Sequence, residues 1–344
     1  MERRVSSLMS GWMLRLMLFA VTALALTATC TVVGLTQDGA QVPGVEPQPA
    51  RVLLTVVDKN RSFVSTLKAE DIRVVSEGGA QEVLSLERQT GAALRLVLMM
   101  DASASQEQVL PVARGVALAF VDAVLRPQTD EAAVVSFTGE MTVEQDLTSE
   151  VAQVRQAIGR VRFVAPPGWK RGGILVTGQN LPSAPPVGAS TALWDALWKV
   201  SDEVLSKAPA GARRAVILLT DGSDTTSRIK RDDAVRKLIE SGVVVYAVGL
   251  GDKTFPYDGV YKDTLTRLSE RTGGRAFFPS KTAELDSIFA RIREELREQY
   301  VVTFRPKNGK GGDSYRKLKI ELINPELRRQ DLSLAYPQGY FVRP

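Results

Sequence analysis

Three short segments rich in oxygen-bearing side chains lie beside apolar runs of the chain. They are Asp101-Ala102-Ser103-Ala104-Ser105, Gly188-Ala189-Ser190-Thr191 and Thr220-Asp221-Gly222-Ser223-Asp224. Mg²⁺ takes near-octahedral oxygen ligation, with one or two carboxylates, and keeps several waters. The carboxylates of Asp101 and Asp221 would roughly neutralise a divalent cation, and the hydroxyls of Ser103 and Ser105, at alternate positions, can face the same way. The three segments therefore predict a site for a small, hard cation.

The composition excludes several other kinds of site. The 344 residues include no histidine, which rules out Ser-His-Asp triads, histidine-bound zinc and HExxH metalloprotease chemistry. The only cysteine, Cys30, lies near the N-terminus, so the rest of the chain has no thiol chemistry. No P-loop or GxSxG motif is present either. We therefore expect a protein that is not an enzyme.

The elements that would position these segments alternate along the chain. Nearly continuous apolar runs, typical of strands buried on both faces, occur at 94–100, 132–137, 215–220 and 243–248, with a weaker one at 275–278. Helical patterns lie between them, at 106–125, 150–161, 193–205, 231–241, 262–272 and 283–297. This order predicts an α/β domain over 91–298, with a doubly wound, mostly parallel sheet flanked by helices and an antiparallel edge strand at 141–147. Ligands gather at the carboxyl ends of strands in such sheets, which is where the oxygen-rich segments fall.

Short β-strand patterns flank this domain on both sides. They lie at 51–58, 72–76 and 82–87 before it, and at 300–304, 316–322 and 332–336 after it. Because isolated strands leave unpaired edges, we expect the strands of 299–344 to pair with those of 50–90 as a small all-β module.

The N-terminal 34 residues have the pattern of an export signal. Three arginines precede an apolar run, Leu16–Leu26. Near the C-terminal end of this run, Ala23-Leu24-Ala25 has the small-x-small pattern of a signal-peptide cleavage site. Cleavage there is the first interpretation, an uncleaved signal-anchor the second, and a lipidated Cys30 the third. A Gly/Pro/Gln-rich linker, 35–49, follows. We expect an exported protein of the periplasm or cell surface that meets the membrane only through this segment.

The motifs together resemble the metal-ion-dependent adhesion site of von Willebrand factor A domains. D-x-S-x-S follows the first strand, a Thr precedes a central helix, and T-D-G follows an apolar strand. The resemblance covers about 94–289, and the flanks, ending in G-Y-F, look like extended bacterial secreted proteins that carry this domain. It implies that the hydroxyls ligate a cation directly and that both aspartates act directly or through water. The implied ligand set is Asp101, Ser103, Ser105, Thr191 and Asp221, holding Mg²⁺ or alternatively Mn²⁺ or Ca²⁺.

Each motif also has a plainer interpretation. Asp-x-Ser-x-Ser after a strand is commonly an Asx turn that caps the next helix, and Asp-Gly is an everyday turn. Their joint order on the expected elements favours the metal site. Asp224 is expected either to cap a helix or to support the ligands, and Asp195 to be solvated or supporting.

The resemblance implies a protein-binding module of the cell envelope, in which a partner's Asp or Glu completes the cation's coordination. The alternatives are an envelope scaffold or assembly factor whose metal site is structural, and, third, a metal-assisted hydrolase. A Pro/Gly-rich insertion at 164–188 departs from the family pattern and could set specificity or cover the site. Its Trp169, Lys170 and Arg171 are candidate partner contacts. The net charge of +5 includes no dense basic block, so no nucleic-acid partner is expected.

Overall fold

The computed structural model describes residues 48–165, 169–170, 174–175, 190–209, 211–251, 260–307 and 314–342. All of these belong to one compact unit, Val45–Pro344, which is distinct from Met1–Gly44. The expected export signal and nearly all of the linker lie outside the described residues. Over the described ranges, no helix combines the length and apolar character needed to cross a bilayer.

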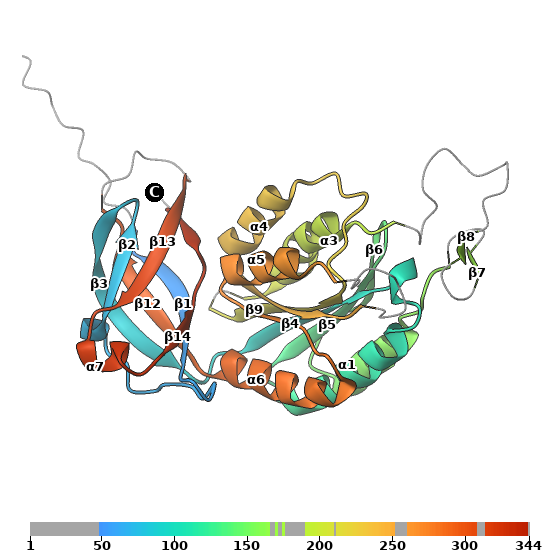
Figure 1. Ribbon diagram of the computed structural model, residues 1–344, viewed down its shortest axis with the longest axis horizontal. Helices are drawn as coiled ribbons and strands as arrows, with labels where there is room; N and C mark the ends of the chain where they lie inside the picture. Colours follow the sequence, from blue (N-terminus) through green and yellow to red (C-terminus); the bar gives the residue numbers. More distant parts are fainter. Residues whose placement is uncertain are drawn as a thin grey trace, which may run out of the picture. The chain divides into compact units, whose positions relative to one another are not determined.

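The first of two large sheets has six strands in the order β11-β10-β9-β4-β5-β6 (Figure 1). The strands are β4 (Leu94–Asp101), β5 (Glu131–Phe137), β6 (Met141–Thr148), β9 (Arg213–Thr220), β10 (Val243–Gly249) and β11 (Ala276–Phe277). Pairing is parallel except for β6, which runs antiparallel to β5 at the edge, as expected for 141–147. All eight residues of β4 are buried, which explains its nearly continuous apolar run.

Helices cover both faces of this sheet. One apolar cluster joins alternate β4 residues, such as Leu96 and Leu98, to α1 (Leu110–Val124), α2 (Val151–Arg160) and α6 (Leu285–Arg297). The other cluster joins Val97 and Met99 to three further helices. These are α3 (Leu193–Lys199), α4 (Arg231–Glu240) and α5 (Lys262–Thr272). Figure 1 shows α1 and α6 on one side of the sheet and α3, α4 and α5 on the other.

Two helix boundaries differ from the sequence prediction by more than two residues. The helix expected from residue 106 begins at Leu110, after a 3₁₀ turn at Ala104–Gln106, and Pro111 lies in its first turn, where its missing N–H is no loss. The helix expected over 193–205 is α-helical only to Lys199. It continues as a π-helical turn (Val200–Val204) and a 3₁₀ turn (Leu205–Lys207). Hydrophobic periodicity does not distinguish these closely related helices.

The second sheet has seven strands in the order β14-β1-β12-β3-β2-β13-β15. They are β1 (Ala50–Val57), β2 (Ile72–Ser76), β3 (Gly79–Gln89), β12 (Gln299–Arg305), β13 (Ser314–Leu322), β14 (Ser333–Ala335) and β15 (Gly339–Val342). Strands from before and after the first sheet pair antiparallel, β1 and β3 with β12 and β2 with β13. The sequence patterns missed β15, which is only four residues long, and the short helix α7 (Pro325–Arg328). The domain boundaries derived from the sequence stay a prediction.

The core of the second sheet is built from aliphatic and aromatic side chains. Leu54, Val74 and Val302 are fully buried in it. The ring of Phe304 packs edge-on against Tyr340 with centroids 5.0 Å apart. A 3₁₀ turn at Ala69–Asp71 lies directly before β2. The flanks of the chain thus share a core of their own.

Candidate metal centre

The site lies at the carboxyl ends of two neighbouring parallel strands. Asp101 is the last residue of β4, and Thr220 is the last residue of β9, directly before Asp221. The two strands pair in parallel up to Met100 and Leu219. Because equal ends of parallel strands meet at one edge of a sheet, residues 119 positions apart become neighbours there.

Asp101 is held by two short contacts. Its Oδ1 accepts the backbone N–H of Ser103 at 2.9 Å, and its Oδ2 accepts the hydroxyl of Thr220 at 2.5 Å. The first contact is the Asx turn that the D-x-S-x-S pattern indicates. The Thr220 hydroxyl in turn accepts the backbone N–H of Gly222 at 3.0 Å. Gly222 has φ of +84°, and a Cβ there would lie 2.9 Å from Leu265 Cγ, so this turn needs glycine.

A chain of hydroxyls joins Asp221 to the β4 loop. Ser105 Oγ donates to Asp221 Oδ2 at 2.5 Å and lies 3.2 Å from Ser103 Oγ. The side-chain amide of Gln106 also donates to Asp221 Oδ2, at 3.1 Å. One hydrogen-bonded group, which we call the Asp101 group, therefore contains Thr220 and four of the five expected ligand residues. These four are Asp101, Ser103, Ser105 and Asp221. The sequence analysis missed Gln106 because nothing in its local pattern shows that it faces the end of β9.

Thr191 is brought to the same end of the sheet by its backbone. Its N–H donates to the hydroxyl of Thr225 at 2.8 Å, and its carbonyl accepts the N–H of Thr225 at 2.8 Å. The next residue, Ala192, donates its N–H to the carbonyl of Thr138 at 2.7 Å. Within the described contacts, the Thr191 hydroxyl makes no hydrogen bond to the Asp101 group. It is nevertheless buried between the loops that follow β5 and β9.

Asp224 and Asp195 have structural contacts of their own. Asp224 Oδ1 accepts the backbone N–H of Leu193 at 2.9 Å, so it caps the start of α3 from a different loop. Asp195 Oδ1 accepts the backbone N–H groups of Arg228 and Ile229 at 2.9 and 2.8 Å. Together they tie α3 to the loop after β9. Neither is bonded to Asp101 or Asp221 in the described part of the chain.

Both central carboxylates are buried, with exposed fractions of 2% for Asp101 and 3% for Asp221. Burial, and next the nearby charge of Asp221, raise the pKa of Asp101 to about 7. Burial likewise raises the pKa of Asp221, against the hydrogen bonds from Ser105 and Gln106. Over the described residues, no Lys or Arg forms an ion pair with either carboxylate. Two buried like charges without a cationic side chain call for another source of positive charge.

The donor set fits a hard divalent cation. It combines two carboxylates with hydroxyl oxygens, and it offers no nitrogen or sulfur ligand. Among the described residues, no cluster of three or more His, Cys, Asp and Glu side chains could hold a metal ion. Within the described part of the chain, a metal ion at this place would therefore be held by hydroxyl oxygens beside the two aspartates.

The expected partner contacts fall largely outside the described residues. Trp169–Lys170 form a two-residue strand, β7, paired with β8 (Ile174–Leu175). Their side chains, Arg171 and most of the 164–188 insertion lie beyond what the structure describes. Their role in partner binding stays a prediction.

Comparison with family models finds two matches, both described as von Willebrand factor type A domains. One covers residues 177–291 and the other residues 4–114. The first contains Thr191 and Asp221, and the second contains Asp101, Ser103 and Ser105. None of the curated proteins compared matches this chain.

Several solved structures are similar to the chain at low identity. Proximal thread matrix protein 1 from the mussel byssus is 20% identical, with 62% of this chain and 49% of that protein covered and a TM-score of 0.47. Another structure of that protein, with a zinc-occupied MIDAS motif, is 21% identical over 66% of this chain and 50% of the other, also with a TM-score of 0.47. A von Willebrand factor type A protein from Catenulispora acidiphila is 12% identical, with 87% and 74% covered and a TM-score of 0.45. The chain thus spans about half the length of the mussel protein.

Proposed function

This chain is a von Willebrand factor type A domain protein, and from that premise we propose that it binds another protein through a divalent cation. The observation that carries the proposal is the pair of buried carboxylates, Asp101 and Asp221, joined through hydroxyls and lacking a described cationic side chain. We take the six-stranded sheet with its helices as a doubly wound core, and the flanking strands as an all-β module.

The residues of the site would have different roles. Hydroxyls of Ser103, Ser105 and Thr191 would ligate the cation directly, while Asp101 and Asp221 would act directly or through water and balance its charge. The hydrogen bonds from Thr220 and Ser223 hold these carboxylates in place before any cation binds. Holding ligands in advance lowers the ordering cost of binding.

The bound cation would supply an electrophilic position that a carboxylate oxygen can fill. We propose that an Asp or Glu of the partner fills it, with Mg²⁺ as the first expectation and Mn²⁺ or Ca²⁺ as alternatives. A protein built for this task needs no catalytic base or nucleophile, in accord with the lack of histidine in the chain. We therefore propose a binding role without catalysis.

We place this activity in the cell envelope on the strength of the N-terminal pattern alone. Arginines followed by an apolar run are typical of an export signal or signal-anchor. The protein would then meet its partner in the periplasm or at the cell surface. A scaffold or assembly factor with a structural cation is the competing proposal.

Thermal unfolding of the full chain tests the cation site. Mg²⁺, Mn²⁺ or Ca²⁺ should raise the melting temperature in a saturable way compared with a chelator, and Asp101→Asn should lose this response. Asn keeps the shape of the side chain and removes one of two neighbouring buried charges, so the variant should fold. Asp122→Asn, at an exposed ion pair with Arg155, is the matched control and should respond like the wild type.

The competing scaffold role gives a different result in a second measurement. Once a partner protein has been identified, its binding should be lost when a chelator removes Mg²⁺ at a temperature well below the melting temperature. Partner binding that survives chelation and Asp101→Asn, in a protein that still gains stability from Mg²⁺, would favour the structural role. A full lack of response to all three cations in both proteins would contradict the metal site itself.

A further inference from the structure

A cavity of about 1050 Å³ lies away from the metal centre, between helices α4 and α5 and the second sheet. It shares no lining residue with the Asp101 group. Its charged lining is dominated by six cationic side chains against two carboxylates, Glu77 and Asp232. The six, which we call the basic groove residues, are Arg231, Arg236, Arg267, Arg271, Lys317 and Lys319.

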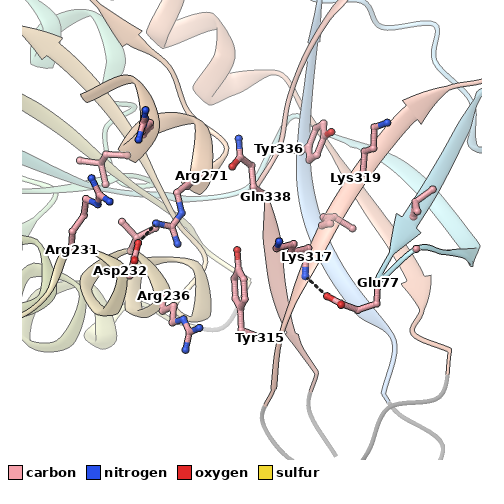
Figure 2. A pocket seen from close by; sticks show the side chains of 16 residues that line it. Glu77, Arg231, Asp232, Arg236, Arg271, Tyr315, Lys317, Lys319, Tyr336 and Gln338 are labelled. Carbon is pink, nitrogen blue, oxygen red and sulfur yellow. Dashed lines mark hydrogen bonds and ion pairs between the residues drawn. The ribbon is translucent and has the colours of Figure 1, made fainter. Parts of the chain in front are cut away.

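Contacts within the compact unit bring the two walls of this groove together. The backbone N–H of Gln338 donates to the carbonyl of Arg271 at 3.1 Å, which ties the β14–β15 connection to the end of α5. The guanidinium of Arg236 lies 5.4 Å from the ring centroid of Tyr315. Figure 2 shows Arg231, Arg236 and Arg271 on one side and Tyr315, Lys317 and Lys319 on the other.

Few of the cations are neutralised by neighbouring acids. Arg271 pairs with Asp232 at 2.5 Å, and Lys319 pairs with Glu321 at 2.6 Å. The Glu77 carboxylate accepts the backbone N–H of Lys317 and not its ammonium group. Within the described residues, no ion pair involves the four other cations. These are Arg231, Arg236, Arg267 and Lys317, all of them exposed.

The cations are spaced regularly along each wall. Tyr315, Lys317 and Lys319 occupy alternate positions of β13, so they share one face of the strand while Leu318 and Ile320 face the core. On α5, Arg267 and Arg271 lie one helical turn apart and so point the same way. Apolar lining from Val235 and Leu268 lies between the charges. The groove therefore combines repeated positive charge with a partly apolar floor.

We propose that the basic groove binds an extended acidic peptide segment of a partner protein. Alternate side chains of an extended peptide lie about 6.8 Å apart, the repeat of the cations on β13. Its backbone and intervening side chains could contact the apolar floor and the lining residues Tyr315 and Tyr336. A bilayer surface is too flat to enter a recess between a helix pair and a sheet, which disfavours an anionic membrane as the occupant. This surface is separate from the cation site and does not depend on it.

The binding test uses a fluorescein-labelled peptide of about ten residues in which Glu and Ser alternate. Fluorescence anisotropy should show that the peptide binds to the full chain. The affinity should fall as the salt concentration is raised, because the Debye length, about 8 Å at physiological ionic strength, becomes shorter and screens the charges more strongly. A peptide of the same composition with all its glutamates in one block should bind less tightly. Equal binding of the two peptides, or of a Gln-for-Glu version, would overturn the proposal.

The variant Arg267→Glu/Lys317→Glu changes one cation on each wall. We expect it to weaken peptide binding at least about tenfold, since reversing two exposed charges removes the electrostatic attraction that speeds association and adds like-charge repulsion. Arg267→Gln/Lys317→Gln should give an intermediate loss, which guards against misfolding of the first variant. Arg51→Glu/Arg293→Glu, on exposed positions of β1 and α6 outside the groove, is the control with the same change in net charge and should stay within about twofold of the wild type. Equal losses in the groove and control variants would refute the groove as the site.

Two further arms distinguish peptide binding in this groove from phosphate binding and from binding at the metal centre. Vesicles containing phosphatidylglycerol and a single-stranded oligonucleotide test phosphate-rich ligands, and tight binding of either through the same residues, without peptide binding, would overturn the peptide proposal. A chelator and Asp101→Asn test the metal centre. Peptide binding should persist under both, so failure of the cation-dependent function and failure of the groove would be seen independently.

Discussion

A buried aspartate lies at each end of strand β4, namely Asp130, which directly precedes β5, at the amino end and Asp101 at the carboxyl end. The pKa values of these two carboxylates are shifted in opposite directions. At the amino end, Asp130 accepts the N–H of Leu94 at 2.9 Å and pairs with Arg297. Burial works against ionisation of Asp130, but the hydrogen bonds from Arg297, Leu94 and Arg126 outweigh it and lower the pKa. At the carboxyl end, burial and the charge of Asp221 raise the pKa of Asp101 to about 7.

The difference shows which carboxylate the fold itself neutralises. Arg297 comes from α6 and reaches Asp130 from 167 positions away, so a resident side chain supplies the positive charge. No described Lys or Arg does so for Asp101. The chemistry of the two sites follows from this contrast: one is a structural ion pair, and the other is suited to an external cation.

The largest expected effect is at the amino end of β4. Asp130→Ala leaves the largely buried side chain of Arg297 without its carboxylate partner and should cost about 3–5 kcal/mol of unfolding free energy, measured by urea denaturation. Asp122→Ala, which breaks the exposed pair with Arg155, should cost no more than about 1 kcal/mol. Similar losses of unfolding free energy in both variants would mean that burial of an ion pair has little influence on how much it stabilises this fold.

At the carboxyl end, the equivalent stabilisation should depend on added cation. A saturating cation at about 100 times its dissociation constant should raise the unfolding free energy by about 2.7 kcal/mol. Asp221→Asn should remove this gain and leave stability in chelator unchanged or higher, because one of two neighbouring buried charges is gone. If Asp130→Asn also abolished the gain in unfolding free energy on adding cation, the cation response would not be specific to the carboxyl end of β4.

The pH dependence of stability should have opposite signs at the two ends. The pKa of Asp130 is lowered on folding, so its contribution is present above the unfolded-state pKa and is lost as pH falls through the folded-state value. In chelator, the pKa of Asp101 is raised from 3.8 to about 7, so stability should fall as pH rises through that window. Each group contributes at most about 1.4 kcal/mol per pH unit. The free energy of unfolding, measured in chelator from pH 3 to pH 8, should show both dependences. Asp130→Asn should flatten the acidic region in which stability rises with pH, and Asp101→Asn should flatten the region in which stability falls as pH rises.

The smallest expected effect concerns Gln106, which donates to Asp221 at 3.1 Å and to the carbonyl of Leu250 at 3.3 Å. Gln106→Ala should cost about 1 kcal/mol of stability and weaken cation affinity about 10-fold or more, because residues that orient metal ligands have effects of this size. Calorimetric titration with Mg²⁺ measures the affinity. Arg114→Ala, on α1 and bonded to the carbonyl of Val161, should leave it unchanged.

Much of the fold could be predicted because it is encoded locally. The fully buried β4 has a nearly continuous apolar run, and α5 begins and ends where its periodicity indicates, closed by Gly273 at φ of +87°. The antiparallel edge strand β6 followed from the short turn before it. By contrast, the four-residue strand β15 carries too little pattern to be recognised, and its place in the sheet comes from pairing with β13.

What the sequence by itself determined is the kind of chemistry this chain can offer. The absence of histidine, the single Cys30 and the D-x-S-x-S and T-D-G segments limit any metal centre to oxygen ligands at strand ends. Only the tertiary structure decided how those oxygens are connected, that Asp224 caps α3 from another loop, and that Arg297 neutralises Asp130 while no described cation neutralises Asp101. The physical reason is that residue type and periodicity are local properties, whereas the charge state of a buried group depends on neighbours that folding brings from far along the chain.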